Sequence, residues 1–224
     1  MLEKHLKEIK ELLYKMANIA EDMVRFSIKA LVEKRLEFTD KVINELEPQV
    51  NELEIDIDEK VIRAIALYSP EAKDLRTLVM VAKMVKDIER VGDLAVNIAE
   101  FGRELIPQPK VKPYIDLPRM AEIAVQMLDD SINAFISQDA GLGLEICKRD
   151  DVVDSLNDQI IRELITFILS DPSTINRSIL IIRISENVER IADQATNIGE
   201  YVVYIVESKV IKHHHFEKED KNEG

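Results

Sequence analysis

The chain has 224 residues, of which 46% are hydrophobic and 33% charged, with only six glycines and seven prolines. This composition is typical of long amphipathic helices and argues against a β-sandwich or an α/β fold. The formal net charge of −13 argues against binding to nucleic acid, because phosphate contacts require clustered lysine and arginine.

Three features of the sequence indicate a soluble cytoplasmic protein. No run approaches the roughly 18 consecutive apolar residues that a membrane-spanning helix needs. The segment MLEKHLKEIKELL lacks the basic patch and apolar run of a signal peptide. Cys147 is the only cysteine, which excludes a disulfide framework and fits a reducing compartment. A location at the inner face of a membrane would therefore depend on partner proteins.

In the first half of the chain, apolar residues recur with a period of 3.6 and predict three amphipathic helices. These helices are expected at about residues 2–38, 41–68 and 70–102. Thr39 or Asp40 is the expected N-cap of the second helix, and Pro48 is expected to kink it or delay its regular start. Ser69 and Pro70 are expected to be the N-cap and first residue of the third helix.

Four of the seven prolines then fall within twelve residues and predict a stiff, extended linker: Pro107, Pro109, Pro113 and Pro118. The second half repeats the pattern, with helices expected at about residues 117–138, 142–169 and 173–209. We therefore predict two tandem three-helix bundles, residues 1–104 and 119–210, joined by the linker 105–118. The charged tail, 211–224, has no periodicity and is predicted to be disordered.

One twelve-residue element occurs twice, at an offset of 100 residues. ERVGDLAVNIAE occupies residues 89–100 and ERIADQATNIGE occupies 189–200, with seven of the twelve positions identical. Residues at i, i+4 and i+8 lie roughly on one stripe of a helix. The first copy therefore projects Glu89, Asp93 and Asn97 from one face, and the second copy projects Glu189, Asp193 and Asn197.

A second pair of polar rows follows the same offset. The second helix of the first half carries Asn51, Glu54 and Asp58, and its counterpart carries Asp151, Asp154 and Asp158. Like charges four residues apart destabilise a helix, and burying them costs more unless a positive charge lies between them. A bound cation is the simplest explanation, although acidic rows that are solvated or paired with arginine are the alternative. Oxygen ligands suit Mg, Ca, Mn or Fe better than Zn.

The doubled ER-(V/I)-x-D-x-A-x-N-I-x-E element, the proline-linked halves and the matching acidic rows resemble the PhoU family of phosphate-uptake regulators. The resemblance covers about residues 1–210 and implies an all-α fold of two three-helix bundles. It implies that metal, as iron in multinuclear clusters, binds four acidic-x-x-x-Asp motifs: Glu54/Asp58, Glu89/Asp93, Asp154/Asp158 and Glu189/Asp193. Mn, Mg, Ca and Zn remain alternative metals.

The resemblance further implies a non-enzymatic, cytoplasmic negative regulator of phosphate uptake and phosphate-starvation signalling. Its expected partners are the ATPase component of a phosphate ABC transporter and a sensor histidine kinase, and a homodimer stays open. Two other functions are compatible with the residues. One is a metal-independent helical scaffold. The other is an iron-binding oxidase, which the absence of any Glu-x-x-His motif disfavours.

Overall fold

The computed structural model describes residues 1–211, and every regular element in that range is a helix. The helices are α1 (Leu2–Glu33), α2 (Leu36–Lys41), η1 (Val42–Leu46), α3 (Glu47–Tyr68), α4 (Ala72–Leu105), α5 (Asp116–Ser137), α6 (Ala140–Ser170), η2 (Pro172–Thr174) and α7 (Ile175–Glu207). The predicted all-α class is therefore confirmed. The tail predicted to be disordered lies outside the described residues, apart from residue 211.

The first helix ends earlier than the sequence predicts. Lys34 adopts a left-handed conformation, with φ of 57°, and the Arg35 N–H donates to the carbonyl of Ala30 at 3.0 Å. This backbone arrangement closes the C-terminus of a helix without requiring glycine. The apolar period runs on past this point, so periodicity alone did not reveal the break.

The second helix begins before its predicted N-cap and contains an irregular turn. Thr39 and Asp40 lie inside α2, so their predicted capping role is wrong. The π-helical turn η1 follows, and Pro48 lies in the first turn of α3. Proline lacks an N–H and clashes with the carbonyl four residues earlier, which a wider turn relieves. The predicted delay of the regular helix at Pro48 is therefore confirmed.

The boundary between α3 and α4 also differs from the prediction. Ser69 is the C-cap of α3 in a left-handed conformation, with φ of 44°, and its N–H donates to the carbonyl of Ile65 at 3.1 Å. It is not the N-cap of α4, which starts at Ala72. Proline disfavours right-handed helical geometry in the residue before it, so Ser69-Pro70 ends one helix instead of opening the next.

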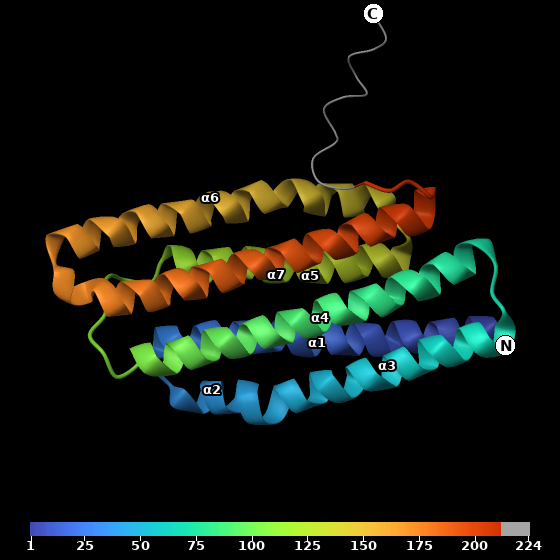
Figure 1. Ribbon diagram of the computed structural model, residues 1–224, viewed down its shortest axis with the longest axis horizontal. Coiled ribbons are helices and arrows are strands. Elements are labelled where there is room, and N and C mark those ends of the chain that lie inside the picture. Colours follow the sequence, from blue (N-terminus) through green and yellow to red (C-terminus); the bar gives the residue numbers. More distant parts are fainter. Residues whose placement is uncertain (212–224) are drawn as a thin grey trace, which may run out of the picture.

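The connection between the two halves spans residues 106–115 and is shorter than the predicted linker. Pro118 lies inside the first turn of α5. Backbone N–H groups in the first turn have no partner within the helix, so the N–H that proline lacks costs no hydrogen bond there. The two sets of helices lie side by side along the long axis of the molecule, with α4 against α7 and α1 against α5 (Figure 1). The α3–α4 and α6–α7 turns lie at opposite ends of the molecule (Figure 1).

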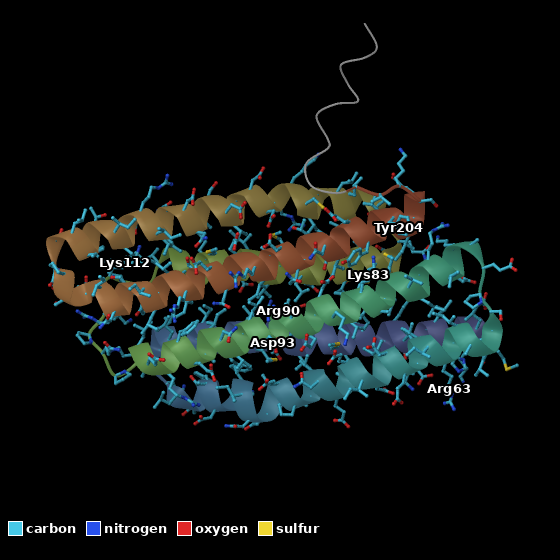
Figure 2. The ribbon with its side chains drawn as sticks, in the orientation of Figure 1. Arg63, Lys83, Arg90, Asp93, Lys112 and Tyr204 are labelled. Carbon is cyan, nitrogen blue, oxygen red and sulfur yellow. The ribbon has the colours of Figure 1, made fainter. Side chains whose placement is uncertain are left out.

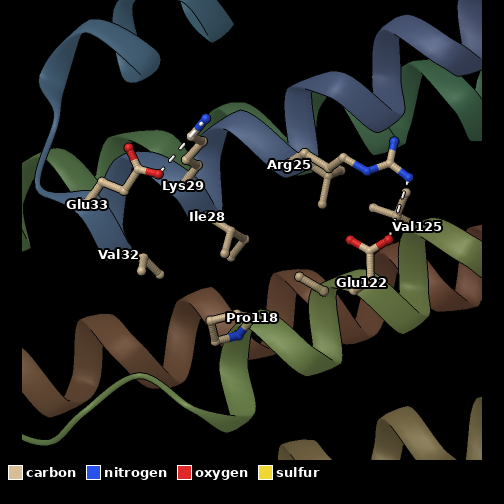
Figure 3. A pocket seen from close by; sticks show the side chains of 10 residues that line it. Arg25, Ile28, Lys29, Val32, Glu33, Pro118, Glu122 and Val125 are labelled. Atoms are coloured by element: carbon tan, nitrogen blue, oxygen red, sulfur yellow. Dashed lines mark ion pairs between the residues drawn. The ribbon is translucent and has the colours of Figure 1, made fainter.

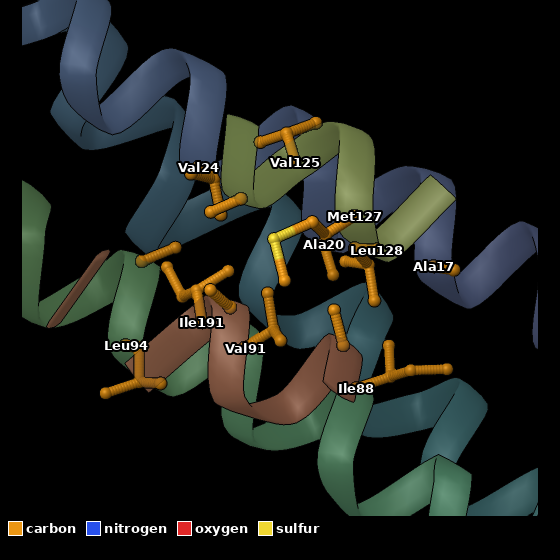
Figure 4. Packing of buried hydrophobic residues seen from close by; sticks show 14 of the residues in the cluster. Ala17, Ala20, Val24, Ile88, Val91, Leu94, Val125, Met127, Leu128 and Ile191 are labelled. Atoms are coloured by element: carbon orange, nitrogen blue, oxygen red, sulfur yellow. The ribbon is translucent and has the colours of Figure 1, made fainter. Parts of the chain in front are cut away.

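One hydrophobic core runs through both halves. Val91 and Leu94 of α4 and Ile191 of α7 are fully buried, and α1 and α5 contribute Val24 and Leu128 to the same cluster (Figure 4). The three helices of each half therefore bury one face within their own set and another against the partner set. The face that each set buries against the other set therefore has apolar neighbours that a single three-helix bundle would lack.

Two contacts between α4 and α7 are equivalent under the 100-residue offset. In one the cation comes from the first half and the ring from the second, and in the other the roles are reversed. The Lys83 ammonium lies over the ring of Tyr201 at 5.5 Å, and the Arg183 guanidinium lies over the ring of Phe101 at 5.7 Å. Lys83 corresponds to Arg183 and Tyr201 to Phe101 in the repeat. The two halves are thus related by an approximate two-fold axis.

Candidate functional site

In the first half, the acidic row of α3 and the doubled element of α4 face each other. Burial, then Asp93, then Glu54 raise the pKa of Glu89, so carboxylates from both helices act on one another. Glu54 is only 17% exposed at its side chain and Asp58 is 31% exposed. Asp93 and the neighbouring Arg90 lie midway along α4 (Figure 2). The structure therefore brings together both predicted acidic pairs of this half.

Glu47 joins this first group and was not predicted. Burial, then Asp93 and Glu100, raise the pKa of its carboxyl. Glu47 precedes Glu54 by seven residues, two turns of an α-helix, so the two side chains leave α3 in nearly the same direction. The seven-residue spacing from Glu54 could have predicted Glu47, but the predicted pairs were based on four-residue spacings.

Positive side chains are built into the first group. The Lys86 ammonium, on α4, donates to Glu54 and lies 3.5 Å from Asp58 Oδ2. Arg90 Nη1 lies 3.3 Å from Asp93 Oδ2, one turn along the same helix. These pairs offset part of the repulsion among the carboxylates at the surface of the protein. Glu47, Glu54, Asp58, Glu89 and Asp93 are hereafter called the first carboxylate face.

In the second half, the corresponding surface of α6 and α7 is more crowded with negative charge. Burial, followed by Asp193, Asp154, Glu189 and Asp151 in that order, raises the pKa of Asp150 to about 7. Burial, then Asp193 and Asp154, also raise the pKa of Glu189. Asp150, Asp154, Glu189 and Asp193 are hereafter called the second carboxylate face.

Asp150 is the most perturbed residue of this face, and the sequence analysis did not select it. Its Oδ1 atom is buried and has no hydrogen-bond partner. A buried carboxylate oxygen without a donor is costly and normally has one. Asp150 precedes Asp154 by four residues, but the first half has Val50 at its position, so a search restricted to repeated residues could not find it.

The other predicted ligands differ in how far they are buried. Asn51 and Asp151 are exposed, as is Asp158, and Asn197 is half-buried on α7. The Asn97 amide donates to Asn187 Oδ1 at 3.5 Å, across the contact between α4 and α7. Eight residues rotate a helix by about 80°, so Asn97 turns from the Glu89 direction toward the other half of the molecule.

No three histidine, cysteine, aspartate or glutamate side chains within residues 1–211 are arranged so as to hold a metal ion. The chemistry of both faces is nevertheless that of a hard-cation site, because carboxylate oxygens are the ligands and the Asp150 oxygen lacks a partner. Side-chain rotations that bring the carboxylates of one face together would be required. Lys86 already provides one positive charge for the first face.

A groove between α1 and α5 lies outside both faces. Ile28, Val32 and Pro118 form apolar parts of its wall (Figure 3). The ion pair of Arg25 with Glu122, at 3.7 Å, spans it from one helix to the other (Figure 3). None of the predicted metal ligands lines this groove.

Among residues 1–211, no helix combines the length and low polarity that crossing a membrane would require.

The sequence matches the PhoU domain twice, at residues 13–102 and 117–202. The chain is 39% identical over 215 residues to the phosphate-specific transport system accessory protein PhoU homolog of Aquifex aeolicus, covering 96% of this chain and 97% of the relative. PhoU homolog 2 of Thermotoga maritima is 33% identical, with 97% and 92% coverage.

Solved structures give the same result. The crystal structure of PhoU from Pseudomonas aeruginosa superposes with a TM-score of 0.89 at 30% identity, covering 93% of this chain and all of that one. The phosphate transport system regulatory protein PhoU from Streptococcus pneumoniae shares the fold, with a TM-score of 0.87 at 23% identity. With two domain matches over most of its length and this identity to PhoU relatives, the chain belongs to the PhoU family.

Proposed function

We propose that this protein is a regulatory accessory protein of a phosphate transport system that restrains phosphate uptake. The observation that carries the proposal is the 39% identity, over nearly the whole chain, to a relative named as a phosphate-specific transport system accessory protein. The protein would act in the cytoplasm as a non-enzymatic adaptor. Its partners would be the ATPase component of a phosphate ABC transporter and a sensor histidine kinase of phosphate starvation.

The proposal includes metal binding at the two carboxylate faces. The raised pKa values of Glu89, Asp150 and Glu189 support it, because burial and then neighbouring carboxylates disfavour the charged form of each, and a bound cation would offset both effects. The buried, unpartnered Oδ1 of Asp150 gives further support. Iron in multinuclear clusters is the metal that the family resemblance suggests, with Mn, Mg, Ca and Zn as alternatives.

Deleting the gene tests the regulatory part of the proposal. Cells without the protein should take up labelled phosphate faster than wild-type cells when phosphate is abundant, and expression of the wild-type chain should restore the slower rate. Pull-down of the tagged protein should recover the transporter ATPase. Unchanged uptake in the deletion strain would contradict a restraining role.

A metal-independent scaffold is the second candidate, and one observation favours it. Lys86 already pairs with Glu54 and Asp58, so the first face has a counter-ion without any metal. Elemental analysis of protein purified without chelator separates the candidates. The metal-binding function predicts bound metal that is lost when Glu89→Gln, Asp93→Asn, Glu189→Gln and Asp193→Asn are combined. The scaffold function predicts metal-free protein whose melting temperature does not change when metal or chelator is added.

A further inference from the structure

The connection between the two halves shows how one end of the molecule is closed. After α4, the non-helical residues 106–115 run past the C-terminus of α1 and the first turn of α7. Lys34 Nζ donates to the carbonyl of Gln108 at 3.0 Å, and Arg177 Nη1 donates to the carbonyl of Pro109 at 2.9 Å. Cationic side chains of α1 and α7 therefore hold this segment by its backbone oxygens, in charge-assisted hydrogen bonds.

The equivalent junction at the opposite end of the molecule is hollow. Under the approximate two-fold axis, α5 takes the place of α1, and α4 takes the place of α7. Gln138 corresponds to Lys34, since each is the left-handed C-cap of its helix, with φ of 57°. A pocket of about 480 Å³ lies between Gln138 and the first turns of α1 and α4. It is lined by Glu3, Leu6, Lys7, Lys10, Lys73, Asp74, Thr77 and Gln138.

Two lysines of this pocket lack an acidic partner in the part of the chain that the structure describes. Lys10 is half-buried and forms no ion pair there. Lys73 Nζ donates to the neutral side chain of Gln138, at 2.7 Å from its Oε1 atom. Burial, then Lys73, lower the pKa of Lys10, because each ammonium disfavours the charge of the other. The two acids among the lining residues are exposed, and neither pairs with these lysines. A negatively charged group in the pocket would offset this repulsion.

The segment that follows α7 is the counterpart of the connection between the halves. Because α4 and α7 are equivalent helices, the residues from 208 onward correspond to the segment that begins at residue 106. The C-terminus of α7 lies at the end of the molecule where α1 begins and α3 turns into α4, which is the end with the pocket (Figure 1). Residues 216–224, FEKEDKNEG, carry four acids and two lysines. The chain after residue 211 could span up to about 40 Å if extended, which suffices to reach across one end of a helical bundle.

We propose that residues 208–224 pack into the pocket between α1, α4 and α5, with acids of residues 216–224 paired with Lys10 and Lys73. The segment would take the place that the connection between the halves takes at the other end of the molecule. It would act as an internal ligand that closes a basic pocket and restricts the access of other anions. This inference goes beyond the proposed function and does not depend on metal binding.

Cross-linking of the full-length chain with a water-soluble carbodiimide tests the position of the segment. The reagent activates a carboxylate, a nearby amine displaces it to form an amide, and the carbodiimide leaves as its urea. Mass spectrometry of the digested protein should find amide links from Glu217, Glu219 or Asp220 to Lys10 or Lys73. A mixture of ¹⁴N- and ¹⁵N-labelled protein distinguishes links within one chain from links between two chains.

Three results of this experiment would overturn the proposal. The first is the absence of any link from the segment. The second is a set of links spread equally over exposed lysines away from the pocket, such as Lys15 and Lys29. The third is a set of links that form only between chains, which would show that the segment binds a second copy of the protein.

Neutralising the acids tests whether their charge holds the segment in place. The combined changes Glu217→Gln, Glu219→Gln and Asp220→Asn should speed amide hydrogen exchange in the early turns of α1 by about two- to fivefold. Exchange in α2, at the other end of the molecule, should not change (Figure 1). Lys218→Gln with Lys221→Gln is the matched control in the same segment, and it should not speed exchange in α1. Wild-type exchange in the acid variant, or equal acceleration in the control, would reject the pairing.

Discussion

Glu21 is an acidic residue of α1 that is only 5% exposed, next to the groove between α1 and α5. Arg25 Nη1 donates to its carboxylate at 3.1 Å, and the same guanidinium lies 3.7 Å from Glu122 on α5. The pKa of Glu21 is raised to about 7, because burial and the neighbouring Asp129 raise it by more than the hydrogen bond from Arg25 lowers it. The residue therefore titrates near neutrality in the folded protein, far above its usual range.

This shift predicts how stability depends on pH. The folded state binds the Glu21 proton more tightly than the unfolded state, so the free energy of unfolding should fall as pH rises from about 4.5 to about 7. Glu21→Gln removes the titration, should flatten this slope and should stabilise the protein by about 1–3 kcal/mol at pH 8. Urea unfolding at several pH values measures the effect. Glu122 also pairs with Arg25 but is mostly exposed, so Glu122→Gln should leave the pH dependence of the free energy of unfolding unchanged. If Glu21→Gln showed the same pH dependence as the wild type, the pKa assigned to Glu21 would be contradicted.

At the scale of elements, α6 and α7 approach each other closely at a pair of glycines. A Cβ on Gly143 would lie 2.9 Å from the Gly199 carbonyl oxygen, and a Cβ on Gly199 would lie 2.9 Å from the Gly143 oxygen. Real Cβ atoms do not come this near to a backbone oxygen, so an added methyl group would push the helices apart. Gly199, a small residue of the doubled element, thus permits the close packing of α7 against α6.

Gly143→Ala should destabilise the protein by about 1–3 kcal/mol in urea unfolding, because the two backbones cannot both stay in place. Gly102→Ala is the matched control, since its Cβ would meet Leu31 at an ordinary 3.8 Å. There alanine should stabilise α4 by about 0.5–1 kcal/mol, through its higher helix propensity. A Gly143→Ala variant as stable as the wild type would show that α6 can shift freely.

At the scale of the whole molecule, the shared core predicts that the two halves unfold together. Val91, Leu94 and Ile191 are fully buried at the contact of α4 with α7, and either half alone would expose them. Thermal unfolding of the full chain should therefore give one transition, coincident by far-ultraviolet circular dichroism and by tyrosine fluorescence. The fragment 1–105 should lose this cooperative transition.

Ile191→Ala tests the same coupling with a single side chain. The substitution should cost about 2–5 kcal/mol and lower the midpoint of the one transition without splitting it. Leu169→Ala, at a position that is 77% exposed, should change stability by less than about 0.5 kcal/mol. Two separate transitions in the wild type, or an isolated fragment 1–105 that melts like the full chain, would show independent domains.

Features that depend on local spacing could be predicted from the amino-acid sequence alone. The 3.6-residue period gave the long helices, the 100-residue offset gave the duplication, and the four-residue spacings found Glu89/Asp93 and Glu189/Asp193. These predictions succeeded because a helix fixes which neighbours in sequence share a face. The doubled element, the proline-linked halves and the acidic rows together resemble the PhoU family, and the domain matches confirm this resemblance.

Packing between helices that are distant in the chain fixes which of those faces meet and which side chains lie between them. It turned Asn97 toward α7, added Glu47 and Asp150 to the acidic groups, and placed Lys86 against Glu54 and Asp58. It also joined the halves through one core. Spacing shows which residues share a face of one helix, but it does not show which faces of different helices meet, because that depends on the rotation of each helix about its axis. That rotation is set by packing against helices that are distant in the chain.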